Sequence, residues 1–131
     1  MELPRNGSVV MFMLVRTTAG RPTGYPMTGL FSDGTLQITT YRKAAKARYL
    51  LADDRVCCVV PDPERAGAGV RLVGRAVPSE GSELAASTRS NSAVIDVPDE
   101  VRAAVRDRLE SNKRMVFRID VERIEEIGAP A

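Results

Sequence analysis

The tripeptide Ser32-Asp33-Gly34 constrains the fold of this chain more than any other feature. An Asp-Gly pair supplies the positive φ angles that a tight hairpin turn needs. The flanking segments, 27–31 and 35–40, are bounded by turn residues and have the composition of strands. The sequence therefore predicts that these two segments pair as antiparallel strands.

Four more segments indicate strands, and Gly- and Pro-containing turns separate most of them. Their expected ranges are 9–15, 56–60, 70–77 and 115–127. The first is continuously apolar, which predicts a strand buried on both faces. In the third, Gly74 predicts a bulge or a close approach of another backbone segment.

Helices are expected at the periphery of these strands. Residues 43–52 are rich in Ala, Lys, Arg and Leu and contain no Gly or Pro, which favours a short helix. Pro98, followed by two acids, indicates the start of a second helix that extends to about Glu110. Residues 83–88 are either irregular or a third short helix. The predicted fold is mainly β (α+β): a small, closed or half-closed antiparallel barrel of six strands with two or three peripheral helices.

Composition excludes several classes of protein. The 131 residues predict a single domain, 1–131, and contain no His, so an imidazole-based triad or metal site is impossible. Any chemistry must therefore come from a bound cofactor. No metal site is predicted. The net charge of +2 without a basic block argues against nucleic acid as a partner.

Location and redox state are also constrained. No apolar run approaches the roughly 20 residues that a membrane helix needs, and no secretory signal precedes the first strand, so we expect a cytoplasmic protein without a membrane partner. Cys57 and Cys58 are adjacent and would point to opposite faces of a strand. The simplest interpretation is that both are small core residues.

Residues 39–46 form the candidate binding site. A strand ends and a helix begins there, and the first turn of a helix offers unpaired N–H groups and a positive dipole end to an anion. Thr hydroxyls and cationic side chains would add charge-assisted hydrogen bonds. The alternative is a solvated helix face. The candidate residues for a bound phosphate are Thr39, Thr40, Tyr41, Arg42, Lys43 and Lys46.

The order of these features resembles the pyridoxamine 5′-phosphate oxidase-like flavin-binding split barrels, over most of the chain. The matching segments are Gly24-Tyr25-Pro26, Ser32-Asp33-Gly34-Thr35-Leu36, Thr39-Thr40-Tyr41, Lys46-Ala47-Arg48-Tyr49-Leu50, Asp53-Asp54-Arg55-Val56 and Val73-Gly74-Arg75-Ala76. The resemblance implies a six-stranded split barrel that forms a homodimer, with FMN at the subunit interface. It also implies that the cofactor phosphate lies at the strand-to-helix junction.

The function implied is hydride transfer between FMN and a small organic substrate. The alternatives are a reductase that uses the deazaflavin coenzyme, or a non-catalytic module that binds or carries a flavin. No catalytic side chain is assigned. Tyr25 and Tyr41 are candidates to approach the flavin ring, or else pack at the barrel rim. Arg71 and Arg75 either reach a cofactor tail from the partner subunit or pair with surface acids.

The chain departs from the vitamin-forming oxidases of this family at several positions. Pro26 and Phe31 stand where those enzymes carry an Arg and a Lys, and Ala44 or Ala45 replaces a Ser. Near the C-terminus only Arg123 is present, without the Trp of the substrate-phosphate motif. We therefore do not expect pyridoxamine-phosphate oxidase activity itself.

Overall fold

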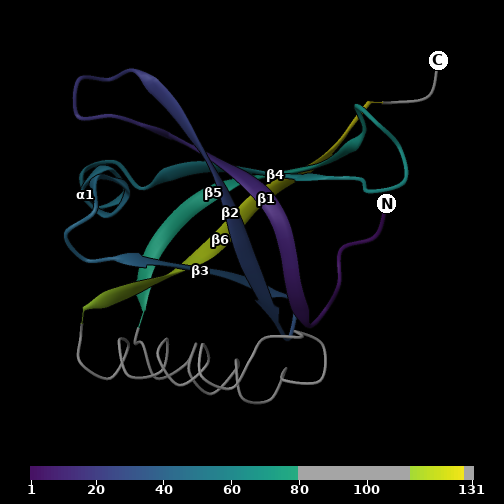
Figure 1. Cartoon of the computed structure of the whole chain (residues 1–131), viewed down its shortest axis with the longest axis horizontal. Helices are drawn as coiled ribbons and strands as arrows, with labels where there is room; N and C mark the ends of the chain where they lie inside the picture. Colours follow the sequence, from purple (N-terminus) through teal and green to yellow (C-terminus); the bar gives the residue numbers. More distant parts are fainter. Residues whose placement is uncertain (80–112, 129–131) are drawn as a thin grey trace.

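The computed structural model describes residues 1–79 and 113–128, and strands of this part close into an antiparallel barrel (Figure 1). The strands are β1 (Gly7–Arg16), β2 (Pro22–Ser32), β3 (Thr35–Tyr41), β4 (Arg55–Pro61), β5 (Gly69–Ser79) and β6 (Arg114–Ile127). Their order around the barrel is β1-β2-β3-β6-β5-β4. The predicted six-stranded barrel is confirmed. The helices expected at 83–88 and from Pro98 to Glu110 lie outside the described residues.

The Asp-Gly hairpin joins β2 to β3 as predicted. Asp33 and Gly34 have φ angles of 49° and 82°, and Ser32 pairs with Thr35 across the turn. The N-terminal segment secures this turn, since the Asp33 amide donates to the Asn6 side-chain oxygen at 3.0 Å. Both central residues have positive φ, and an Asp-Gly pair adopts this backbone conformation more readily than most other residue pairs.

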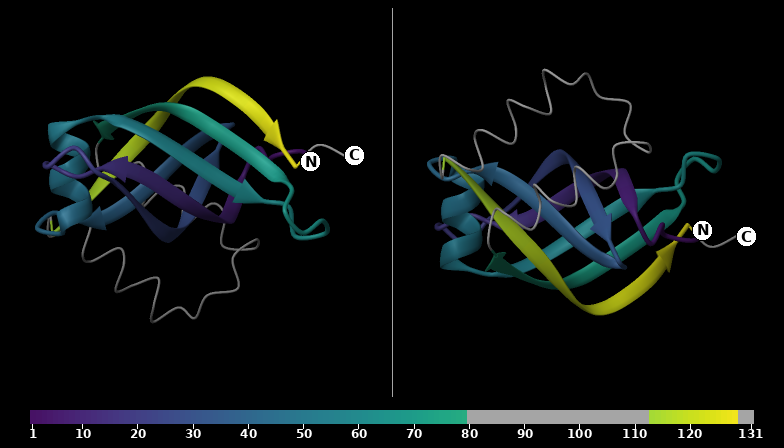
Figure 2. Two further views of the ribbon diagram at one scale, coloured as in Figure 1. Left: turned by 90° about the horizontal axis from the view of Figure 1, so that it is seen from above. Right: turned by 90° about the horizontal axis from the view of Figure 1, so that it is seen from below.

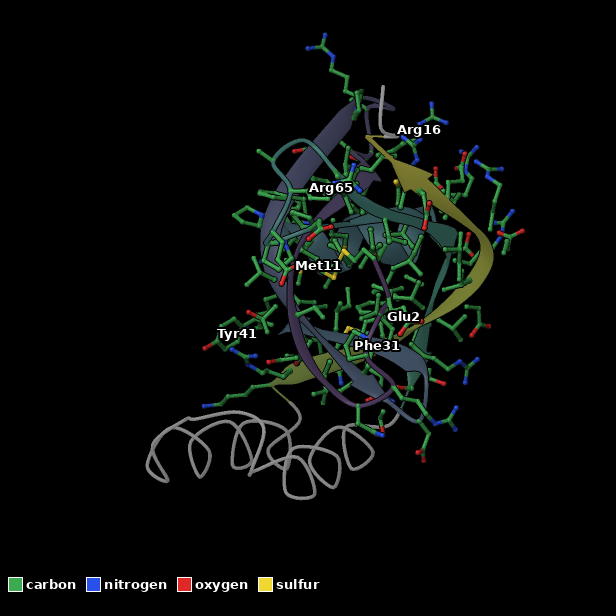
Figure 3. The ribbon with its side chains drawn as sticks, turned by 90° about the vertical axis from the view of Figure 1, so that its right-hand side faces the viewer. Glu2, Met11, Arg16, Phe31, Tyr41 and Arg65 are labelled. Atoms are coloured by element: carbon green, nitrogen blue, oxygen red, sulfur yellow. The ribbon has the colours of Figure 1, made fainter. Side chains whose placement is uncertain are left out.

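Alternate side chains of every strand fill the barrel. Met11 and Phe31 lie inside it, whereas Tyr41 points away from it (Figure 3). The interior is built mainly from aliphatic residues and methionine, as the low aromatic content predicts. The largest fully buried side chains are Phe117, Met11, Met13, Leu36, Ile38, Leu50, Leu72, Val60, Val116 and Cys58.

The prediction that β1 is buried on both faces is wrong. Met11, Met13 and Val15 point into the core, but the alternate residues face outward. We call these the β1 outer face: Val10, Phe12 and Leu14, which are 71%, 46% and 40% exposed. A continuous apolar run predicts that other side chains bury both faces of the strand, but within one chain only the inner face is fully buried.

The two cysteines of β4 differ in environment. Cys58 is completely buried in the barrel, and burial raises the pKa of its thiol to about 12. Cys57 points outward and is only half-buried, with a thiol pKa that burial also raises. The core prediction is therefore confirmed for Cys58 and wrong for Cys57.

Helix α1 (Ala45–Ala52) stands across one end of the barrel, and the β4–β5 turn lies at the other end (Figure 2). Ala47 and Leu50 are buried against the core on the inner side of the helix. The helix ends as predicted before Asp53, whose amide donates to the Tyr49 carbonyl at 2.9 Å. Among the described residues, no helix has the length and apolar character required to span a membrane.

The predicted irregularity at Gly74 is present. The register of the β5–β6 ladder shifts between Val73 and Gly74, which pair with Arg123 and Val121. The backbone of β6 comes so close to Gly74 that a Cβ atom there would overlap the carbonyl oxygen of Asp120. Glycine is therefore required at this position because two backbones meet.

Replacing Gly74 with alanine is expected to lower the free energy of unfolding by about 2–3 kcal/mol, since β6 must move to admit the methyl group. Urea denaturation followed by circular dichroism measures this change. Gly24→Ala is the matched control, because its Cβ would meet nothing closer than 3.8 Å. Equal stabilities of the two variants would show that the close approach has no energetic consequence.

Candidate functional site

The barrel is open between β2 and β3 at the end that carries α1. These strands pair only from Leu30 to Ser32 with Thr35 to Gln37. Beyond this short ladder, β2 continues along β1, and β3 continues along β6 to Tyr41. Helix α1 lies between the diverging strands (Figure 1). Among the described residues, no strand pairs with the facing edges of β2 and β3 beyond this ladder, and such edges can offer main-chain hydrogen bonds to a ligand.

The N-terminus of α1 lacks a protein cap. The helix begins at Ala45, two residues later than predicted, so Arg42 and Lys43 lie in the preceding turn. The N-cap residue Ala44 has no side chain that could accept from the first turn, and that turn contains no acid. Within this segment, the N–H groups of the first turn and the positive end of the helix dipole are therefore not compensated by an acidic or capping side chain.

The two threonines at the end of β3 lie on opposite faces. Thr40 pairs with Met115, points inward and is 4% exposed, whereas Thr39 points outward beside Val116. Both hydroxyl oxygens are buried and have no hydrogen-bond partner among the residues that the structure describes. A buried hydroxyl without a partner is costly, so a ligand that accepts from it would bind favourably.

Lys46 extends from the first turn of α1 toward β2. Its ammonium nitrogen lies 5.2 Å from the centre of the Tyr25 ring, within the range of a cation–π interaction. Tyr25 is half-buried and packs against the core. The contact joins the helix to the far side of the opening and places one cation at the mouth between β2 and β3.

Two cations of this site come from a distant part of the chain and were not predicted. Tyr41 pairs with Arg114 at the start of β6, and the Arg42 amide donates to the Lys113 carbonyl at 2.9 Å. The guanidinium carbon of Arg114 lies 4.5 Å from the centre of the Tyr41 ring. No local motif marks Lys113 or Arg114, because only the β3–β6 register brings them here.

We call Lys43, Lys46, Lys113 and Arg114 the junction cations. None of the four forms an ion pair with an acid in the part of the chain that the structure describes. Their positive charges are thus not neutralised within that part, which makes this edge of the barrel attractive to an anion.

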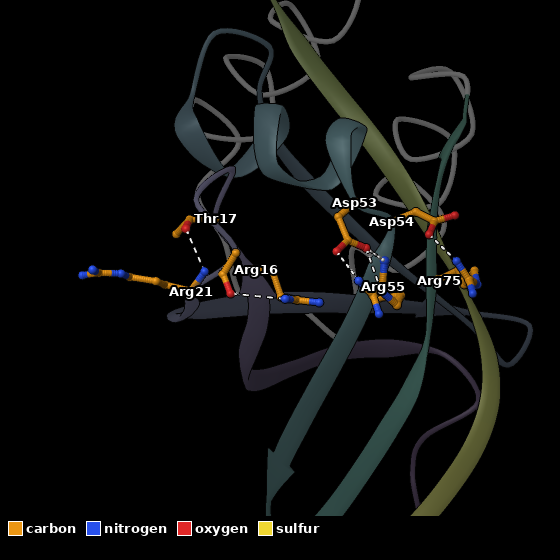
Figure 4. A network of polar contacts seen from close by, with 8 residues as sticks. Arg16, Thr17, Arg21, Asp53, Asp54, Arg55 and Arg75 are labelled. Carbon is orange, nitrogen blue, oxygen red and sulfur yellow. Dashed lines mark hydrogen bonds and ion pairs between the residues drawn. The ribbon is translucent and has the colours of Figure 1, made fainter.

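The other arginines of β4, β5 and β6 provide the contrast. Arg55 binds Asp53 at 2.8 Å and Arg75 binds Asp54 at 2.6 Å (Figure 4). Hydrogen bonds from Arg55 lower the Asp53 pKa to about 2, and Arg118 and Arg123 lower the pKa values of their own partners, Asp120 and Glu125. These surface acids satisfy nearby arginines, whereas the junction cations have no such partners among the described residues.

Arg71 and Arg75 both have acid partners on the barrel surface. Arg71 lies 3.5 Å from Glu125, and Arg75 contacts both Asp54 and Glu122. Both share the outer face of β5, as predicted, and both pair with acids there. The surface-pairing interpretation is confirmed.

A cavity of 330 Å³ lies elsewhere on the barrel wall. Apolar residues of β1, β4 and β5, including Leu14, Cys57 and Val73, form its floor, and Arg16, Arg55 and Arg75 stand around it. None of the residues predicted to bind the phosphate lines it. It adjoins the β1 outer face at Leu14, so apolar surface continues from the strand into the cavity.

Several solved structures are similar to this chain. A conserved hypothetical protein from Mycobacterium tuberculosis has 23% identity and a TM-score of 0.70, with 94% of this chain and 82% of that chain covered. A heme-binding protein from Mycobacterium smegmatis has 26% identity and a TM-score of 0.69, over 92% of this chain and 49% of that one. An F420 reductase has 15% identity and a TM-score of 0.63, with 89% of each chain covered. No curated protein matches significantly.

The overall fold is shared with these solved structures. The family model described as pyridoxamine 5′-phosphate oxidase matches residues 6–128, nearly the whole chain. The chain belongs to the pyridoxamine 5′-phosphate oxidase-like family of split barrels.

Proposed function

We propose that this protein is an oxidoreductase that binds a flavin-type cofactor, FMN or alternatively the deazaflavin coenzyme, with the cofactor phosphate at the β3–α1 junction. The observation that carries the proposal is the absence of acid partners for the junction cations among the described residues, next to two orphaned Thr hydroxyls. A phosphate supplies both the negative charge and the hydrogen-bond acceptors that this arrangement lacks.

The residues present suit such a group. Because Thr39 and Thr40 face opposite sides of β3, one of their two hydroxyls would donate to phosphate oxygens together with the first-turn N–H groups of α1, while Arg42, Lys43 and Lys46 would supply charge. Unpaired backbone edges of β2 and β3 would hold the edge of the ring. When bound, the cofactor supplies hydride transfer, and the protein contributes binding and orientation. Because no side chain is assigned to proton transfer, a non-catalytic flavin carrier is the alternative.

The departures from the vitamin-forming oxidases support a different substrate. Phe31 is 3% exposed in the core, and Pro26 lies on the outward side of β2. Neither can provide the cation found at its position in those oxidases. The β3–α1 junction must therefore hold the cofactor phosphate with its own cations. The absence of the Trp of the substrate-phosphate motif near Arg123 is what favours a small organic substrate of another kind.

We further propose that the protein acts as a homodimer with the cofactor between subunits. The β1 outer face exposes three large apolar side chains in a row, which is unusual for a strand on a solvent-facing wall. Burying Val10, Phe12 and Leu14 against a second copy would provide the cover that the apolar sequence of β1 predicts.

The absorbance spectrum of the purified protein tests the cofactor assignment, together with its melting temperature in FMN and in the deazaflavin coenzyme. Bound flavin gives a yellow protein, and cofactor at 100 times Kd should stabilise the fold by about 2.7 kcal/mol. Anaerobic reduction followed by reoxidation with candidate acceptors distinguishes an enzyme from a carrier. A colourless protein whose melting temperature neither cofactor changes would refute both functions.

A further inference from the structure

Arg114 occupies a defined position beside the proposed phosphate site. It is the first residue of β6 and pairs with Tyr41, the last residue of β3. The adjacent hydrogen bond from the Arg42 amide to the Lys113 carbonyl ties the start of β6 to the turn that leads into α1. Its backbone is thus fixed on both sides of the junction.

The side chain of Arg114 carries a buried hydrogen-bond donor that has no acceptor among the described residues. Its guanidinium carbon stacks 4.5 Å from the centre of the Tyr41 ring, and its Nε atom is buried with no hydrogen-bond partner among the described residues. In the part of the chain that the structure describes, no acid pairs with it, although Arg118 and Arg123 of the same strand each pair with one. The Nε and Nη groups of arginine form a planar fork that matches phosphate and carboxylate oxygens.

We infer that Arg114 is a further binding residue for the anionic group of the cofactor, and that Tyr41 is a positioning residue that holds the guanidinium plane through its ring. This inference rests on the proposed function and adds a ligand contact from β6 to the contacts from β3 and α1. A cation–π contact alone would account for the stacking but not for the buried Nε that lacks an acceptor.

The inference predicts an effect that depends on the phosphate. Arg114→Ala and Arg114→Lys should each weaken FMN binding about tenfold or more, because lysine keeps the charge but lacks the planar fork. Both variants should bind riboflavin, which has no phosphate, as wild type does. Tyr41→Leu should weaken FMN binding by a smaller factor, again without an effect on riboflavin. Fluorescence titration measures all four proteins.

The control is Arg123→Lys, an exposed arginine of the same strand that already pairs with Glu125. It should bind both flavins normally. If the Arg114 variants bind FMN as wild type does, or lose FMN and riboflavin equally, the inference is overturned while the proposed function stands. The proposed function itself fails if the wild-type protein binds FMN no more tightly than riboflavin and also binds the deazaflavin coenzyme no more tightly than its phosphate-free core.

Discussion

The double variant Arg42→Ala/Lys46→Ala is expected to lose its cofactor during purification. Each charge-assisted hydrogen bond contributes about 1.5–3 kcal/mol, so removing two should weaken binding by roughly 100-fold to 10,000-fold. The effect should be this large because Pro26 and Phe31 provide no replacement cations on β2. Flavin content after gel filtration and the Kd for added FMN measure the loss.

A second double variant, Arg5→Ala/Arg65→Ala, controls for the change in net charge. Both residues are exposed, and both lie away from α1, Arg5 near the β2–β3 turn and Arg65 in the β4–β5 turn. This control should retain its cofactor. Wild-type affinity in the Arg42/Lys46 variant would mean that residues 39–46 are a solvated start of a helix.

The barrel was predictable because local signals determine most of its topology. The Asp33-Gly34 turn fixes one hairpin, and Gly74 marks the bulge where β5 approaches β6. The burial of β1 was not predictable in the same way. An apolar run indicates that both faces need cover, but it does not indicate whether the same chain or another molecule supplies that cover.

The candidate site was predictable only where it is local in sequence. Residues 39–46 contain the helix start, the hydroxyls and three cations within eight positions, although Ala44 rather than Arg42 precedes the helix. Arg114 lies 73 residues after Tyr41 in the chain. Its place beside Tyr41 follows from the β3–β6 register, and a register is set by the packing of the whole sheet.

Phe12→Glu is expected to convert the proposed homodimer into a monomer and to release the cofactor with it. Phe12 lies at the centre of the β1 outer face, pairing with Pro26 on one side and Val59 on the other. Loss of a central aromatic side chain weakens the free energy of dimerisation by about 2 kcal/mol or more. Because a two-fold symmetric dimer contains this residue twice, the dimer Kd should rise about a thousand-fold.

Light scattering at micromolar concentration measures the mass, and flavin absorbance in the same elution peak measures retention. The barrel itself should remain folded, since Phe12 points away from the core and its neighbours Met11 and Met13 are unchanged. Phe12→Leu, which keeps an apolar side chain, should remain dimeric and coloured. A wild-type protein that elutes as a monomer with its cofactor bound would instead assign the cofactor to a single subunit, and the apolar face of β1 would then need another partner.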